Sequence, residues 1–64
     1  MNQILTQQQF EDILFNPDLV VVQKDVSSHL EHTTYAYVYE GKLPIYVAVR
    51  HITDKGVSYW KEAI

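Results

Sequence analysis

The stretch TTYAYVYEGKLPIYVAVRHI, residues 33–52, decides the fold. β-branched and aromatic side chains run on both sides of Glu40-Gly41, and such runs are typical of strands. Glycine supplies the positive φ that a two-residue hairpin turn requires. Two antiparallel strands are therefore predicted, from about residue 29 to 40 and from 43 to 52, with a tight turn at Glu40-Gly41.

A third strand is predicted upstream of this hairpin. Residues 19–22 are a leucine followed by three valines, and the strand continues to about Val26. Ser27-Ser28 provides a turn into the next strand. The three strands are therefore expected to form an antiparallel meander.

Two-residue turns at both places set a register. Glu31 then lies opposite Lys24 on one side and Arg50 on the other, and Tyr35 lies opposite Tyr46. Opposite charges across neighbouring strands contribute about 0.2–1 kcal/mol per pair. Two independent turn assignments thus agree on a favourable charge ladder, which supports the register.

This register divides the strand side chains between two faces, one covered and one open, as is common for antiparallel sheets. The face expected to receive helices is aliphatic: Leu19, Val21, Leu30, Ala36, Val38, Leu43, Ile45, Val47 and Val49. The open face is mixed: Val20, Val22, Lys24, Glu31, Thr33, Tyr35, Tyr37, Tyr46, Ala48 and Arg50. A three-residue turn would reverse this parity and put the tyrosines of residues 35–39 into the core.

A helix is predicted before the strands, at residues 6–15. Thr6 and Gln9 form a capping-box pattern, and Leu5 and Phe10 are spaced as a hydrophobic staple. Pro17 ends the helix, because the residue before a proline avoids helical geometry. A helix this short must dock its apolar face to be stable.

A second helix is predicted to close the chain. Thr53 or Asp54 is a suitable N-cap, and Val57, Trp60 and Ile64 share a helical face. The predicted fold is therefore α+β, a single domain of residues 1–64 in the order α-β-β-β-α, with a three-stranded meander and both helices on one face. The expected core joins the helices to the sheet: Phe10, Ile13, Leu14, Trp60, Val38, Ile45, Val47 and Val49.

Composition excludes several function classes. The chain has 64 residues, no cysteine and a net charge of −3. Disulfides and thiolate metal sites are therefore excluded, and general nucleic-acid binding, which needs phosphate neutralisation, is not expected. The N-terminus lacks signal-peptide features and no apolar run is long enough to span a bilayer, so a cytoplasmic protein without membrane association is predicted.

The open face is the main candidate site. Tyr35, Tyr37, Tyr46 and Arg50 are predicted to cluster there, flanked by Val20 and Val22. Tyrosine and arginine are frequent anchors of protein interfaces, and an exposed aromatic patch usually marks a contact surface. Tyrosine also has a high strand propensity, so a solvated strand without function is the alternative. A third reading is that this face packs in a homodimer.

Other chemistries have little support. His32 and His51 are expected on one face, but a zinc site needs three or four ligands. The serines lack a nucleophile-elbow context, and glycine occurs only at Gly41 and Gly56, so no phosphate-cradling loop exists. No catalytic residue, metal or cofactor is predicted, and the chain is not expected to be an enzyme.

One local resemblance suggests an alternative. Residues 49–56, VRHITDKG, resemble the point where the wing strand of winged-helix regulators enters a closing helix. The resemblance implies a DNA-binding transcriptional regulator of degenerate winged-helix form. No segment fits the recognition helix that such a domain needs.

The prediction is a small non-catalytic protein-binding module, a regulator or inhibitor, that uses the open aromatic face. Compact, acidic, cysteine-free chains of this size are often phage or mobile-element products. The alternatives are the winged-helix DNA-binding regulator and a homodimer with a structural or scaffolding role.

Overall fold

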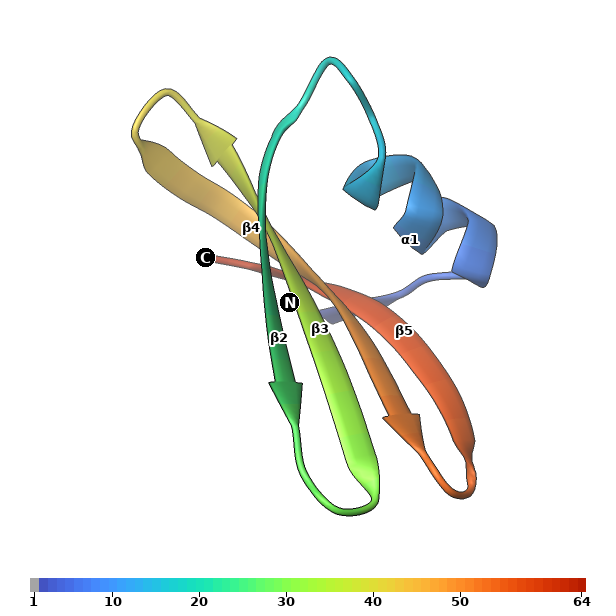
Figure 1. The fold of residues 1–64 in the computed structure, drawn as a ribbon. Coiled ribbons are helices and arrows are strands. Elements are labelled where there is room, and N and C mark those ends of the chain that lie inside the picture. Colours follow the sequence, from blue (N-terminus) through green and yellow to red (C-terminus); the bar gives the residue numbers. More distant parts are fainter. Residues whose placement is uncertain (1) are drawn as a thin grey trace.

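Residues 2–64 are described by the computed structural model, and within them five strands and one helix follow one another (Figure 1). The elements are β1 (Asn2–Ile4), α1 (Gln7–Leu14), β2 (Val20–Ser27), β3 (Glu31–Glu40), β4 (Leu43–Thr53) and β5 (Gly56–Ala63). The strands form one antiparallel sheet in the order β1-β5-β4-β3-β2. The prediction of three strands with two helices is therefore wrong.

The error lies in the C-terminal segment, which is strand β5 and not a helix. Thr53 pairs with Gly56 across a two-residue turn, and the Thr53 hydroxyl accepts a hydrogen bond from the Lys55 N–H at 3.1 Å. Gly56 has a φ of +144°, which is open to glycine and not to a helical residue. The sequence resembling a wing entering a helix is thus a β-hairpin, and the winged-helix alternative loses its basis.

The N-terminal helix is confirmed, together with its cap. The Gln9 N–H donates to the Thr6 hydroxyl at 3.1 Å, and the Gln9 carboxamide accepts from the Thr6 N–H at 2.9 Å. Leu5 and Phe10 are both buried, as the staple requires. The helix ends at the C-cap residue Phe15, two residues before Pro17.

The β2–β3 hairpin turns later than predicted. Ser28 donates its N–H to the Glu31 carbonyl at 2.9 Å, so the turn falls at His29 and Leu30 rather than at Ser27-Ser28. Lys24 consequently lies opposite Tyr35 and not opposite Glu31. Because the displacement is an even number of residues, each β2 side chain still lies on the predicted face.

The β3–β4 hairpin turns at Gly41-Lys42 and not at Glu40-Gly41 as predicted, and it contains a β-bulge that the prediction lacked. Glu40 pairs with Leu43 and Tyr39 with Pro44, but Val38 pairs with Tyr46, so Ile45 is the extra residue. Proline has no N–H to donate to a ladder and is found at bulges for that reason. An odd insertion turns the rest of β4 over, so all its later side chains exchange faces.

The predicted charge ladder is therefore wrong on this side as well. Arg50 lies opposite Thr34, and Glu31 lies opposite Thr53. Tyr46, Ala48 and Arg50 lie on the face covered by α1, which we call the helix face. Val47 and Val49 lie on the opposite face.

The core forms between α1 and the helix face, where α1 packs against β4 and β5. Figure 1 shows α1 on one side of the twisted sheet. The buried cluster and its neighbours are Leu5, Phe10, Ala36, Ala48, Ile13, Leu14, Val21 and Tyr59. Phe10, Ile13, Leu14 and Val38 were correctly assigned to this side, whereas Trp60 was not, and Ile45 remains exposed.

Candidate binding face

The face opposite α1 carries a row of aromatic and branched side chains, which we call the tyrosine face. Strand alternation and the observed pairings place there Val20 and Val22 of β2, Tyr35, Tyr37 and Tyr39 of β3, Val47 and Val49 of β4, and Trp60 of β5. The β3 tyrosines come from the hairpin stretch that decides the fold.

Stacked rings stiffen this face. The ring centroids of Tyr35 and Tyr37 are 6.2 Å apart with an interplanar angle of 25°. Across the sheet, His51 meets Trp60 edge-on at 6.3 Å, and Trp60 Nε1 donates to a Glu62 carboxylate oxygen at 3.1 Å. The aromatic side chains thus hold defined positions relative to one another.

The centre of the tyrosine face is buried without help from the helix. Val49 is 1% exposed, although it lies on the face opposite α1. Its cross-strand neighbours are Tyr35 on β3 and Trp60 on β5. Large flanking side chains therefore cover the middle of the sheet, and these side chains are themselves partly exposed.

The predicted site residues divide between the two faces. Tyr35, Tyr37, Val20 and Val22 lie together on the tyrosine face. Tyr46 and Arg50, which were predicted to join them, lie on the helix face, because the bulge at Ile45 reverses β4.

Both displaced residues have partners on the helix face. The Arg50 guanidinium lies 5.6 Å from the centroid of the Phe10 ring and donates through Nη2 to the Thr34 hydroxyl at 3.1 Å. Its Nε is buried without a hydrogen-bond partner in the described chain. The ring of Tyr46 receives Lys61 Nζ at 5.1 Å. These contacts suit a structural role at the rim of the core.

Trp60 is one of four residues of this face that the predicted site lacked, together with Tyr39, Val47 and Val49. Tryptophan is the most frequent kind of interface anchor together with tyrosine and arginine. The available signal was the short alternation Val57-Ser58-Tyr59 after a Gly-containing turn, which is typical of a strand.

A polar chain extends along the helix face at its β2 side. Thr34 donates its hydroxyl to Asp25 Oδ1 at 2.7 Å, and Asp25 Oδ1 lies 3.3 Å from His32 Nε2. His32 Nδ1 lies 2.7 Å from the Ser27 hydroxyl. Hydrogen bonds from Thr34, then Gln23, then His32 to the carboxylate lower the pKa of Asp25 below its ordinary value of 3.8.

Ser27, His32 and Asp25 form a chain of contacts, and such a chain of serine, histidine and aspartate is what activates a serine nucleophile in some enzymes. The N–H that follows a nucleophilic serine commonly helps to stabilise the oxyanion, but the Ser28 N–H donates to Glu31. Asp25 also lies in an exposed strand rather than a water-excluded site. These side-chain contacts between β2 and β3 therefore fit a role in holding the two strands together better than a role in acyl transfer.

The two histidines expected together are separated. His32 lies on the helix face, whereas His51 lies on the tyrosine face with its Nε2 3.7 Å from a Glu31 carboxylate oxygen. Among residues 2–64 no group of three or more histidine or acidic side chains is placed to hold a metal ion.

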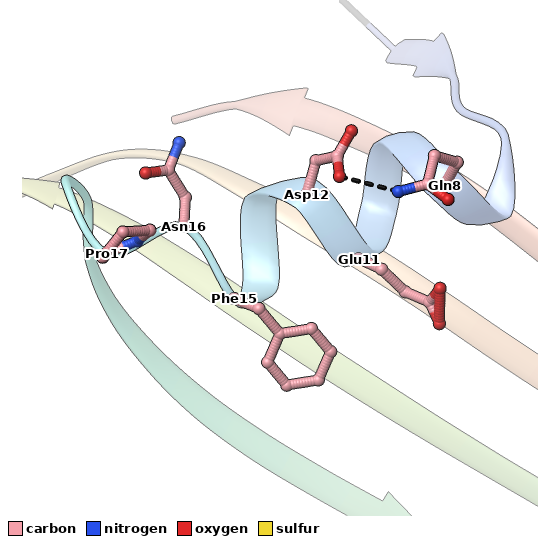
Figure 2. Close-up of a pocket in the computed structure, with 6 residues that line it drawn as sticks. All are labelled: Gln8, Glu11, Asp12, Phe15, Asn16 and Pro17. Carbon is pink, nitrogen blue, oxygen red and sulfur yellow. Dashed lines mark hydrogen bonds between the residues drawn. The ribbon is translucent and has the colours of Figure 1, made fainter.

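A hollow of about 550 Å³ lies at the end of α1 (Figure 2). Glu11 and Phe15 project from one side of the helix there, and Gln8 donates to Asp12 Oδ1 at 2.8 Å on another. The Phe15 ring is 72% exposed. The hollow is a shallow surface groove with mixed acidic and apolar walls.

Across the described part of the chain, no helix has the length and apolar character needed to cross a membrane.

Comparison with known proteins identifies relatives from phages. Residues 1–63 match the model of the Phage T4 Cef protein family. Protein cef of Enterobacteria phage T4 is 53% identical over 60 residues, which is 89% of this chain and 84% of that protein. No solved structure matches. The chain therefore belongs to the Phage T4 Cef protein family, which confirms the predicted phage origin.

Proposed function

We propose that this phage protein is a small non-catalytic protein-binding module that regulates or inhibits a larger partner, and that the tyrosine face is its contact surface. The observation that carries the proposal is a packed aromatic platform that α1 leaves uncovered. The single helix occupies the other face, so no described element competes with a partner for the tyrosines.

The energetics of interfaces favour such a platform. Tyr35, Tyr37 and Trp60 each combine a large apolar ring with a polar end, which is the character of residues that dominate interface affinity. Stacking of Tyr35 on Tyr37 fixes both rings before binding. Less side-chain freedom is then lost when a partner docks.

The charge pattern around the platform indicates a polar rim. Lys24 and Glu31 lie at one side of the tyrosine face, and Glu62 lies beside Trp60. Charges of both signs at a rim direct the orientation of a partner more than they add affinity. A protein partner with a polar surround and an apolar centre fits this arrangement.

The test is site-specific photo-crosslinking in infected bacterial cells. A benzophenone amino acid replaces Tyr37 in one variant and Tyr46 in a matched control, since both are strand tyrosines but they lie on opposite faces. We expect a discrete protein crosslink from position 37 and none from position 46. Separating the soluble and membrane fractions of the same cells tests the proposal that the chain acts in the cytoplasm.

Crosslinks at both positions, or at position 46 alone, would contradict the assignment of the contact surface. A crosslink from position 37 to nucleic acid instead of protein would contradict the partner class. Once the captured protein is identified, purified components give the affinity directly, and alanine at Tyr35 and Tyr37 is expected to weaken it by at least about tenfold.

A further inference from the structure

Strand β2 forms an outer edge of the sheet, with β3 as its neighbour on one side. Antiparallel ladders alternate between hydrogen-bonded and non-hydrogen-bonded pairs. The bond from the Ser28 N–H to the Glu31 carbonyl fixes the phase of this alternation. The even-numbered residues of β2 therefore direct their backbone groups to β3, and the backbone groups of Val21, Gln23, Asp25 and Ser27 point outward.

Three valines expose apolar surface along this outer edge. Val20 is 61% exposed, Val22 51% and Val26 49%, and all three project on the tyrosine-face side of β2. Long regular edge strands are usually protected by charged side chains, by proline, by a bulge or by a covering element. β2 has eight residues in continuous register with β3 and contains no proline, and its charged residues are Lys24 and Asp25, which are adjacent and of opposite sign.

The opposite edge is different. There β1 is only three residues long, and the chain continues into α1 directly after Leu5, whose N–H donates to the Tyr59 carbonyl at 3.0 Å. A short edge of this kind offers little template for another strand. The edge of the sheet that offers a long template to another strand is therefore β2.

We propose that a second copy of the chain covers this edge, with the two β2 strands paired antiparallel about a two-fold axis beside Gln23. The outward backbone groups then match: Gln23 pairs with Gln23 of the second copy, and Val21 pairs with Asp25 of the second copy. Each such pair exchanges two backbone hydrogen bonds. The two sheets become one continuous sheet.

The side chains select this register among its neighbours. About Gln23, Val20 lies opposite Val26 of the second copy, and Val22 lies opposite Lys24 of the second copy. An axis beside Lys24 would put two lysines directly opposite each other, which is unfavourable. An axis beside Val22 would leave the outward groups of Asp25 without partners.

The dimer has a consequence for binding. A two-fold axis perpendicular to the sheet keeps both tyrosine faces on the same side of the dimer. The tyrosine face of one copy therefore continues into that of the other. The dimer itself does not depend on the proposed partner, and its test uses the purified chain alone.

The experiment is light scattering of purified protein from about 1 μM to about 1 mM, a range that covers weak and moderate self-association. We expect a concentration-dependent dimer. Gln23→Pro removes an outward N–H but no bond to β3, so it should give a monomer that keeps the wild-type circular dichroism spectrum. Lys24→Pro is the contrasting variant, because it removes a bond to β3 and should unfold the hairpin.

A second pair of variants tests the register even if the proline variant fails to fold. Val22→Glu places a carboxylate opposite Lys24 of the second copy and should tighten the dimer, whereas Val22→Lys should weaken it, each by about tenfold for the two symmetric pairs. A wild-type monomer over the whole range overturns the proposal. So does a dimer unaffected by a folded Gln23→Pro variant, or equal weakening by both Val22 variants.

Discussion

The two faces of the sheet are built from alternate residues of the same strands, yet they are filled in different ways. On the helix face, Ala36 and Ala48 are fully buried beneath Phe10 of α1. On the tyrosine face, the residues beside them in sequence are Tyr35, Tyr37, Val47 and Val49. Small strand residues leave room for a helix to approach, whereas large ones cover the sheet by themselves. Alanines in adjacent strands therefore mark where the helix docks.

The largest effect should come from the helix face. Phe10 is fully buried and contacts Tyr59 with ring centroids 5.5 Å apart. We expect Phe10→Ala to lower the free energy of unfolding by about 3–5 kcal/mol, which is enough to unfold much of a domain this small. Urea denaturation measures the loss. Phe15→Ala, at an exposed ring of the same helix, should change it by less than about 0.5 kcal/mol.

A moderate effect should come from the centre of the tyrosine face. Val49→Ala removes a buried side chain there, so it should cost about 2 kcal/mol by loss of burial and creation of a cavity. Val22→Ala, at a half-exposed position of the same face, should cost less than half as much. Thermal unfolding of both variants tests whether the tyrosine face contains a packed centre. Equal, small effects would show that it does not.

A smaller effect should follow from the helix cap. Thr6→Ala removes the hydroxyl that accepts the Gln9 N–H, and it should cost about 1 kcal/mol, with Thr6→Ser retaining most of the stability. The loss should weaken docking of α1 and leave the tyrosine face unchanged. A change in the fluorescence of Trp60, the single tryptophan and a residue of the tyrosine face, as large as that from Val49→Ala would contradict the separation of the two faces.

The smallest effect should be the contribution of Asp25 to stability, which depends on pH. The pKa of Asp25 is lowered by hydrogen bonds from Thr34, Gln23 and His32. Its stabilisation is therefore complete above the ordinary value of 3.8 and is lost as the pH falls through that value and below it. The melting temperature of wild type should exceed that of Asp25→Asn at pH 7, and the difference should shrink towards about pH 2. A difference that grows in acid would contradict the sign.

Local signals explain which parts of the fold could be predicted. The capping box at Thr6 and Gln9 acts within one turn, and it correctly fixed the start of α1. The β-branched and aromatic runs correctly located β2, β3 and β4. The spacing of Val57, Trp60 and Ile64 fits a helix. The pairing of β5 with β4 makes this segment a strand instead, and it puts Val57 and Trp60 on opposite faces.

The candidate site was predicted correctly on β3 and wrongly on β4, and the register of the strands explains both results. Tyr35 and Tyr37 lie on the predicted face because the β2–β3 register moved by an even number of residues. Tyr46 and Arg50 lie on the other face because one extra residue in β4 reverses the parity. Pro44 was a readable signal of that bulge, since a proline in an interior strand needs one.

The most direct test of the account is a comparison of two alanine variants in their affinity for the crosslinked partner. Tyr37→Ala and Tyr46→Ala make the same chemical change on opposite faces of one sheet. The account predicts that Tyr37→Ala weakens binding by at least about tenfold while Tyr46→Ala changes it by less than about twofold. Equal losses, or a larger loss from Tyr46→Ala, would contradict the assignment of the tyrosine face as the binding surface.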